Sequence, residues 1–448
     1  MDTPAIAPHA AIEPLIARHA EDAAFYWSQL DSASHSIQIG LPKYAHFNRL
    51  LDAHLEGLAV AGQEGLRLTQ AALQRWKGPA ETFACTWLAV TLDDTPTIEH
   101  VFSQLRKQPD TLLRGVVSAL AWVPPASSLP WITRLGAADG DVPAQVAALR
   151  VAALIGADGI TALPSPLTTY LASPHAFIRA AACRAARRDD ERCTSTLAPA
   201  LRSALLDTDL AVRAEAAIAL ARCGIAENAV AVLWQCVAAQ SDVHRQATGW
   251  YRKPAARRLQ RWIEHLAVMT PLGHPDIRQL LNSLPARFGL TFILHHGDSG
   301  YLPQVLEYMK DPHVARYAGW VWQSLTGLDL AANGWTASET DPGADSENDA
   351  ITEARLDADQ GLPLPDLRAI QAASFAHVNA ISAGVRSLLG KVLTSKHALG
   401  LLEHAPQVLR GIAAQVLMQV LPGVQLSVRG PASNQLRQLA YLQTLENL

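Results

Sequence analysis

A serine in a short segment with a glycine at each end is the first feature of this sequence that could carry out chemistry. Gly297-Asp298-Ser299-Gly300 has the pattern of a loop around a nucleophilic serine, but Tyr301 follows where such loops carry another glycine. A serine nucleophile needs a base within hydrogen-bond reach and an acid that orients this base. The surrounding sequence is helical and indicates neither group in a suitable frame. We therefore interpret the four residues as a turn.

Two neighbouring histidines, His295 and His296, could form a metal site with Asp298. Adjacent histidines do not face the same way on a helix, and the chain has no HExxH-like pair. The five cysteines include no CxxC pair, so we interpret them as small buried apolar residues in a reducing compartment. The sequence predicts no catalytic residue, no metal ligand and no cofactor, and we expect a protein that is not an enzyme.

A basic and aromatic run extends from residue 244 to residue 261, with no acid between Asp242 and Glu264. A surface of this composition suits nucleic acid. It equally suits an acidic protein, because Arg and Trp are favoured at interface hot spots. A third interpretation is a solvated helix face whose aromatic side chains pack inward. The cations are Arg245, Arg252, Lys253, Arg257, Arg258 and Arg261, the aromatics Trp250, Tyr251 and Trp262; the candidates for partner binding are Arg252, Arg257, Arg258 and Arg261.

An acidic stretch extends from Trp335 to Gly361 and holds eight acids against one base, Arg355. This composition is typical of a solvated insertion. Alternatively, the carboxylates imitate nucleic-acid phosphates or attract a basic partner. The candidates for partner binding in this stretch are Asp341, Asp345, Glu347, Asp349, Asp357 and Asp359.

The elements that must position these residues are expected to be helices. Hydrophobic residues make up 49% of the 448 residues and charged residues 17%, and Ala and Leu, both good helix formers, dominate the apolar part. The Ala20, Ala23, Ala24 and Trp27 spacing predicts one amphipathic helix. The formal net charge of −4 lacks the basic excess of a nucleic-acid binder.

Neither a secretory signal nor a membrane span is expected. The first 24 residues lack a basic region followed by an apolar run. The uncharged segment 115–133 contains Pro124, Pro125 and Pro130, which would break a spanning helix. We expect two helices joined by a Pro-rich turn there, and a cytoplasmic protein.

From about residue 80 the chain becomes self-similar. Four stretches share a Pro or Asp turn, an aliphatic residue beside an arginine, and a helix of small residues. Their arginines are 36, 29 and 34 residues apart, the period of a two-helix solenoid repeat. Looser copies follow, the last at 404–417. We expect these arginines to bond carboxylates or carbonyls of a neighbouring repeat; they are Arg114, Arg150, Arg179 and Arg213, with Arg316 in a looser copy.

The repeats resemble HEAT repeats of the short bacterial, phycobilisome-lyase-like type. Beyond the repeats, an ordered set of segments resembles a family of proteobacterial HEAT-like proteins encoded beside genes of type VI secretion effectors. The segments are IARHAEDAAFYWSQLD, HLEGLAVAG, DPHVARYAGWVWQSLTGLDL, GLPLPD and SVRGPASNQLRQLAYL.

The resemblance implies an all-α, HEAT-like α-solenoid, a right-handed superhelix of helix pairs. Its divisions would be a helical N-terminal section (1–78), HEAT-like repeats (79–335), an acidic loop (336–361) and C-terminal helical repeats (362–448). It also implies a toxin-binding role: an immunity protein that occludes a type VI effector, with nucleases among the candidate partners. An adaptor that loads the effector onto the secretion spike is the alternative, and a lyase-type enzyme is a third hypothesis. We expect neither membrane nor nucleic acid as a direct partner.

Overall fold

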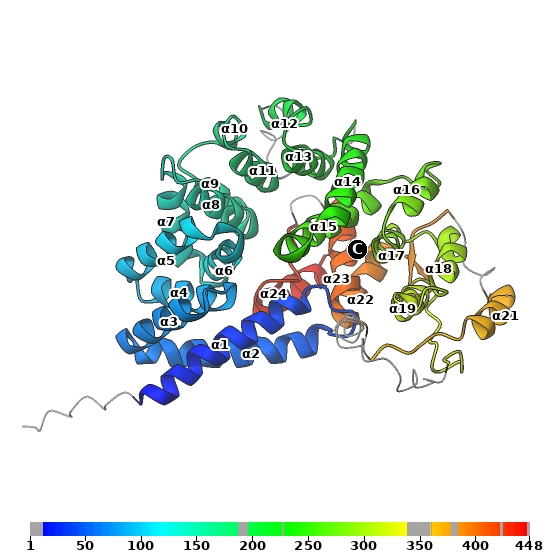
Figure 1. Cartoon of the computed structure of the whole chain (residues 1–448), viewed down its shortest axis with the longest axis horizontal. Helices are drawn as coiled ribbons and strands as arrows, with labels where there is room; N and C mark the ends of the chain where they lie inside the picture. Colours follow the sequence, from blue (N-terminus) through cyan, green and yellow to red (C-terminus); the bar gives the residue numbers. More distant parts are fainter. Residues whose placement is uncertain are drawn as a thin grey trace, which may run out of the picture. The chain divides into compact units, whose positions relative to one another are not determined.

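The computed structural model describes residues 12–186, 196–225, 228–337, 359, 361–377, 384–421 and 424–445. Over these residues nearly every element is a helix, and the two strands are two residues long each. Successive helices pack side by side in series (Figure 1). The prediction of an all-α, HEAT-like solenoid of helix pairs is confirmed. No helix in the described ranges combines the length and the apolar character that crossing a membrane requires.

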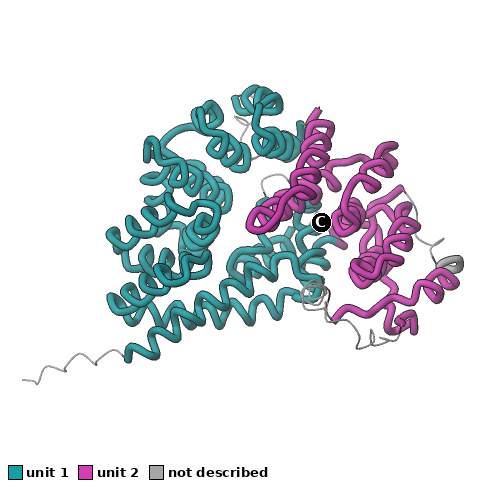
Figure 2. The backbone as a smooth tube through the Cα atoms, viewed as in Figure 1, with its two compact units in different colours: residues 1–225, 398–448 teal, residues 226–397 magenta. Residues whose placement is uncertain are grey.

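The chain forms two compact units, coloured separately in Figure 2. Unit 1 comprises Met1–Ile225 and Ala398–Leu448, and unit 2 comprises Ala226–His397. Each unit has its own buried apolar core. Unit 1 therefore contains both ends of the chain, and unit 2 is the segment between them.

Unit 1 begins with long helices and continues with shorter repeat helices. The predicted N-terminal helix is confirmed, because Ala20, Ala23, Ala24 and Trp27 all lie on its buried face. The helices are α1 (Glu13–Ala33), α2 (Leu41–Ala61), α3 (Gln63–Trp76), α4 (Pro79–Thr91), α5 (Thr95–Lys107), α6 (Pro109–Trp122), α7 (Pro125–Gly136), α8 (Val142–Ile155), α9 (Ala157–Thr161), α10 (Leu167–Leu171), α11 (Ala176–Ala185), α12 (Ala198–Ala204) and α13 (Leu210–Arg222).

The repeat helices of unit 1 stack in a row. Helices α4, α6, α8, α11 and α13 contact one another in succession, and α5, α7, α10 and α12 lie along the outer side of this row (Figure 1). Small side chains allow the close approach: a Cβ atom at Gly115 of α6 would overlap the carbonyl oxygen of Pro79 at the start of α4. Helices α6 and α7 are separated at Val123-Pro124, as Pro124 and Pro125 predict, whereas Pro130 lies inside α7.

Arginines link neighbouring repeats of unit 1. Arg179 donates to both carboxylate oxygens of Asp207, in the turn of the next repeat, at 2.7 and 2.9 Å. Its Nη1 donates to the carbonyls of Ser173 and Pro174 at 2.9 and 3.0 Å. These contacts join two turns, so the expected structural role is confirmed for Arg179. Arg114 likewise forms an ion pair with a carboxylate of α1, that of Asp31.

The C-terminal helices of unit 1 return to its N-terminal helices. They are α22 (Ser395–His404), which begins in unit 2, α23 (Gln407–Val420) and α24 (Ala432–Gln443). The backbone N–H of Gln407 donates to the carbonyl of Ile39 at 2.9 Å. The hydroxyl of buried Tyr44 donates to the carbonyl of Arg429 at 2.9 Å, so α2 holds the segment that precedes α24 in place.

Unit 2 repeats the same stacking with helices α15, α17 and α19, which contact one another in succession around the buried Trp262 and Trp322. The carboxylate of Asp366 caps α21. The elements are α14 (Ala229–Gln246), η2 (Gly249–Tyr251), α15 (Arg252–Met269), α16 (Ile277–Ser283), α17 (Ala286–His296), η3 (Ser299–Tyr301), α18 (Leu302–Tyr308), α19 (Ala315–Thr326), α21 (Leu367–His377) and the antiparallel strands β1 (Ser387–Leu388) and β2 (Lys391–Val392).

Candidate functional site

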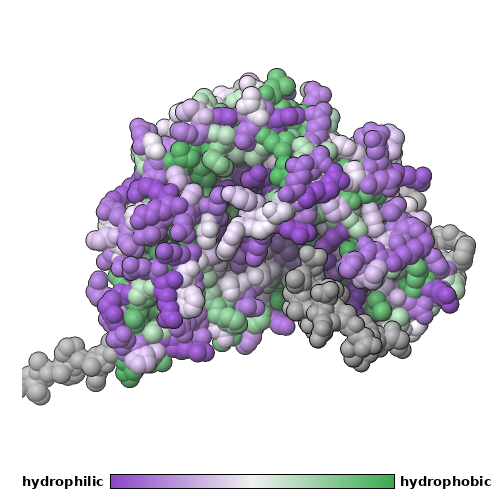
Figure 3. All heavy atoms as spheres, viewed as in Figure 1, coloured by the Kyte–Doolittle hydropathy of each residue, from purple (hydrophilic) through white to green (hydrophobic). Residues whose placement is uncertain are grey.

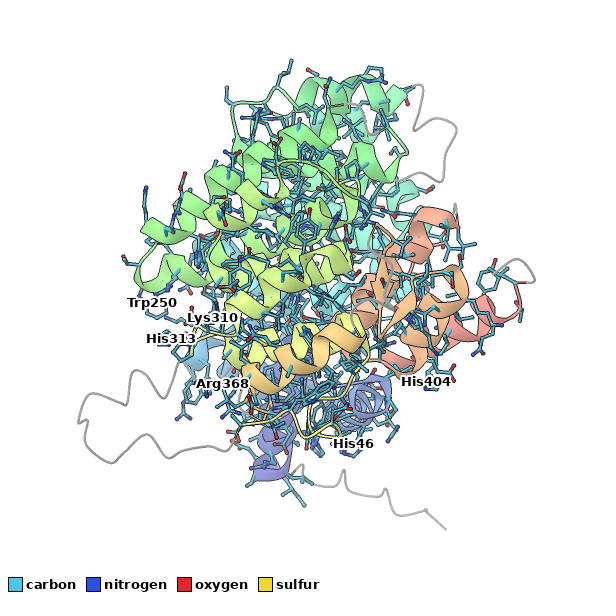
Figure 4. All side chains as sticks on the ribbon, turned by 90° about the vertical axis from the view of Figure 1, so that its right-hand side faces the viewer. His46, Trp250, Lys310, His313, Arg368 and His404 are labelled. Atoms are coloured by element: carbon cyan, nitrogen blue, oxygen red, sulfur yellow. The ribbon has the colours of Figure 1, made fainter. Side chains whose placement is uncertain are left out.

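The turn between α14 and α15 places the basic run of the sequence at the surface of unit 2. Gly249 adopts a positive φ of 53° there, which the lack of a side chain permits. Trp250 and Tyr251 follow in the short helix η2 and are 92% and 80% exposed. Figure 4 shows Trp250 at the free end of the α14–α15 pair. Two adjacent, almost fully exposed aromatic rings form an apolar patch of the kind that another molecule often covers.

The cations of the run lie beside these rings on the outer face of α15. Its opposite face is buried through Leu259, Trp262 and Ile263, which is the helical periodicity of a surface helix. We define the cationic–aromatic cap as Arg245, Trp250, Tyr251, Arg252, Lys253, Arg257 and Arg258, all of which are exposed. The cap thus brings Arg252, Arg257 and Arg258 together, whereas Arg261 is only half-exposed.

Most cations of the cap have no counterion among the residues that the structure describes. Arg245 forms an ion pair with Asp242. Over the described residues, Arg252, Lys253, Arg257 and Arg258 form no ion pair with an acidic group. Arg252 and Lys253 also occupy the first turn of α15, where the helix dipole disfavours positive charge. These cations therefore do not serve to stabilise the helix.

A hollow with a volume of about 400 Å³ opens beside the cap. The end of α14 and the start of α15 form one wall, and the end of α16 with the two residues that follow it forms the other. Its lining consists of His244, Arg245, Arg252, Asn282, Ser283, Leu284 and Pro285. The lining therefore offers two guanidinium groups, an imidazole, an amide and a hydroxyl around one space.

His244 forms the inner side of this hollow as a neutral imidazole. Burial lowers its pKa from the usual value, and the charge of Arg252 lowers it further. Its ring meets Phe288 edge to face with 5.1 Å between centroids. Its Nδ1 atom is buried and has no hydrogen-bond partner in the described structure.

Of the acidic candidates, the structure describes one, Asp359. Asp341, Asp345, Glu347, Asp349 and Asp357 lie outside the described residues.

Asp359 is described, and its buried carboxylate accepts two hydrogen bonds of 2.7 Å from the guanidinium of Arg287. The guanidinium in turn lies over the ring of Tyr317, 4.3 Å from its centroid. Asp359 thus anchors its segment to α17, and we do not include it in a partner-binding surface.

The glycine–serine segment is a turn, as predicted. Gly297 ends α17 with a positive φ of 73°, and the carboxylate of Asp298 accepts hydrogen bonds from the backbone N–H groups of Gly300 and Gly384 at 2.9 and 3.3 Å. His295 and His296 are buried in α17. Across the ranges that the structure describes, no three His, Cys, Asp or Glu side chains converge on a possible metal position.

Burial of His296 makes the stability of unit 2 dependent on pH. Its Nδ1 lies 3.0 Å from the carbonyl of Ala267, and burial lowers its pKa below the ordinary 6.5. As the pH falls below about 6.5, the unfolded chain binds a proton that the native imidazole does not. The free energy of unfolding should then decrease by up to about 1.4 kcal/mol per pH unit until the lowered native pKa is passed.

Urea unfolding between about pH 7 and pH 5 measures this loss. The His296→Gln variant should show a smaller dependence on pH than the wild type. Exposed His46, labelled in Figure 4, supplies the matched control, His46→Gln, which should keep the wild-type slope. Equal slopes for all three proteins would show that burial of His296 has no such effect.

Comparison with known proteins identifies the repeats. Residues 163–250 match the family model of HEAT repeats. This segment includes α10 to α14 and ends at Trp250 of the cap. Neither the comparison with curated proteins nor that with solved structures finds a match.

The fold and this match define the chain as an α-solenoid with HEAT repeats, a class of scaffolds for protein–protein interaction. The family match is to a scaffold and not to a catalytic family.

Proposed function

We propose that this protein is an immunity protein of a type VI secretion system. It binds a cognate effector toxin in the cytoplasm of the producing cell and blocks the toxin's active site by occlusion. The family resemblance of the sequence supports this choice of partner. The observation that carries the binding role is the pair of exposed aromatic rings, Trp250 and Tyr251, beside four cations that form no ion pair with the described residues.

The cap has the composition of an interface hot spot. Trp, Tyr and Arg are the residues that most often dominate binding energy, because each buries a large area and also forms hydrogen bonds or cation–π contacts. Burial of the two rings against a partner would remove from water apolar surface that the isolated chain leaves exposed. The cations around them would become the polar rim of the contact.

Inhibition by occlusion requires no turnover. One molecule of the protein neutralises one molecule of toxin for as long as the complex lasts, so a slow dissociation rate is the property that protects the cell. The stacked helices supply a preformed surface, which reduces the entropic cost of binding. This mechanism needs neither a nucleophile nor a cofactor.

Co-expression with the effector encoded by the adjacent gene tests the proposal. The wild-type chain should restore growth of cells that produce the toxin, and the two proteins should co-purify as a stoichiometric complex. No rescue, combined with loss of effector secretion when the chain is deleted, would contradict the immunity role and would favour an adaptor.

A further inference from the structure

We infer that the cap recognises an acidic surface of its protein partner and that one carboxylate of the partner enters the hollow beside Arg252. This inference rests on the proposed function, since it specifies the chemistry of the effector surface that is bound. The occupant of the hollow is then an Asp or Glu side chain on a folded protein.

The local charge of the cap supports an acidic partner. The whole chain has a formal net charge of −4, yet the cap has five cations, and within the described residues only Arg245 is paired, to Asp242. A local positive surface on a negative protein attracts an acidic patch at short range. A long polyanion such as nucleic acid would extend beyond the cap and would be repelled by the net negative charge of the chain.

Arg252 is the cation best placed to bind the carboxylate. Arg245 is already engaged, because one of its nitrogens donates to Asp242 and another to the carbonyl of Ser283 at 3.4 Å. Arg252 lines the same hollow and has no hydrogen-bond or ion-pair partner among the described residues. A guanidinium with free donors binds a carboxylate through two parallel hydrogen bonds.

The hollow has both the room and a hydrogen-bond donor for an acidic side chain. Its volume of about 400 Å³ accommodates an Asp or Glu side chain. The wall opposite Arg252 supplies the amide of Asn282, which can donate to a carboxylate oxygen. The aromatic rings outside the hollow would then contact the apolar surroundings of that acid on the partner.

Binding measurements on the full-length chain and the purified effector test the inference. Arg252→Glu should weaken the complex by about 100-fold or more, since it replaces attraction by repulsion, and Arg252→Ala by about 10-fold. The matched control is Arg49→Glu in α2, an exposed arginine without an ion pair in the described residues. The control should bind within about twofold of the wild type, and wild-type binding should weaken as salt increases.

The outcomes separate this inference from the proposed function. If the wild type binds the effector and Arg252→Glu binds equally well, the proposed function stands and the acidic contact is wrong. If the wild type does not bind the effector, the proposed function fails.

A labelled oligoglutamate peptide then tests the cap directly. The wild type should bind it, and Arg252→Glu should not. No peptide binding, or tighter binding of an oligothymidylate of equal charge, would overturn the inference.

Discussion

Replacement of Trp250 and Tyr251 by alanine is expected to weaken binding of the effector strongly without changing the stability of the chain. Both rings are almost fully exposed, so their removal should alter the free energy of unfolding by less than about 0.5 kcal/mol. Loss of an aromatic hot spot costs about 2 to 4 kcal/mol of binding energy, which is about 30- to 1,000-fold in Kd. Calorimetric titration with the effector, together with thermal unfolding of each variant, measures both effects.

A second exposed apolar surface provides the control for this experiment. Hydrophobic residues gather over the α9–α13 part of unit 1 in the face shown in Figure 3. Phe177 in α11 is 70% exposed, and Phe177→Ala should bind the effector as the wild type does. If Phe177→Ala lost binding while the cap double variant kept it, the partner would bind to unit 1 and the assignment of the cap would be wrong.

Truncation of Arg410 to alanine is expected to destabilise unit 1 by about 3 kcal/mol. Arg410 is only 2% exposed, and its guanidinium donates to the carbonyl of Leu402 at 2.7 Å and to the side-chain oxygens of Gln407 and Gln435. Burial lowers its pKa to about 10, so it remains charged at neutral pH. Alanine would leave a cavity and buried acceptors without donors, although removal of a buried charge offsets part of this cost.

Urea unfolding measures the change, with Arg437→Ala as the control. Arg437 is exposed on α24 and bonds only to Asn434 in the described structure, so its loss should cost less than about 0.5 kcal/mol. Equal stability of the two variants would show that Arg410 does not hold the C-terminal helices together.

Much of the fold could be predicted from the sequence because the patterns that specify the helices and repeats involve residues close together in the chain. The small-residue helices, the proline breaks and the period of the arginines depend on residues within one or two repeats. Arg179 illustrates this: its partner Asp207 lies in the next turn of the same pattern. The return of α23 and α24 to α2 could not be predicted, because contacts such as that of Tyr44 with Arg429 join residues that are 385 positions apart in the sequence.

The candidate site was only partly accessible to sequence analysis. Composition identifies the basic and aromatic run, but it does not distinguish Trp262, which is fully buried, from Trp250, which is exposed. Once α15 is known to begin at Arg252, helical periodicity places Trp262 on the buried face of this helix, whereas Trp250 precedes it. Asn282 and Ser283 give no signal in the sequence, since only the packing of α16 beside α17 brings them to the hollow.

The environment of Asp359 could not be predicted from the sequence around it. Its acidic neighbourhood suggests a solvated surface, whereas Arg287, at a separation of 72 residues, binds it in a bidentate pair. A charge pattern alone could not reveal this partner, because the pairing is set by tertiary structure.

Hydrogen–deuterium exchange of the chain, with and without the effector, is the most direct test of the account. We expect binding to slow exchange in residues 242–258 and 282–285, which form the cap and the hollow, and to leave the helices of unit 1 unchanged. Protection confined to unit 1, with no change at the turn between α14 and α15, would contradict the central claim that the cap is the binding surface.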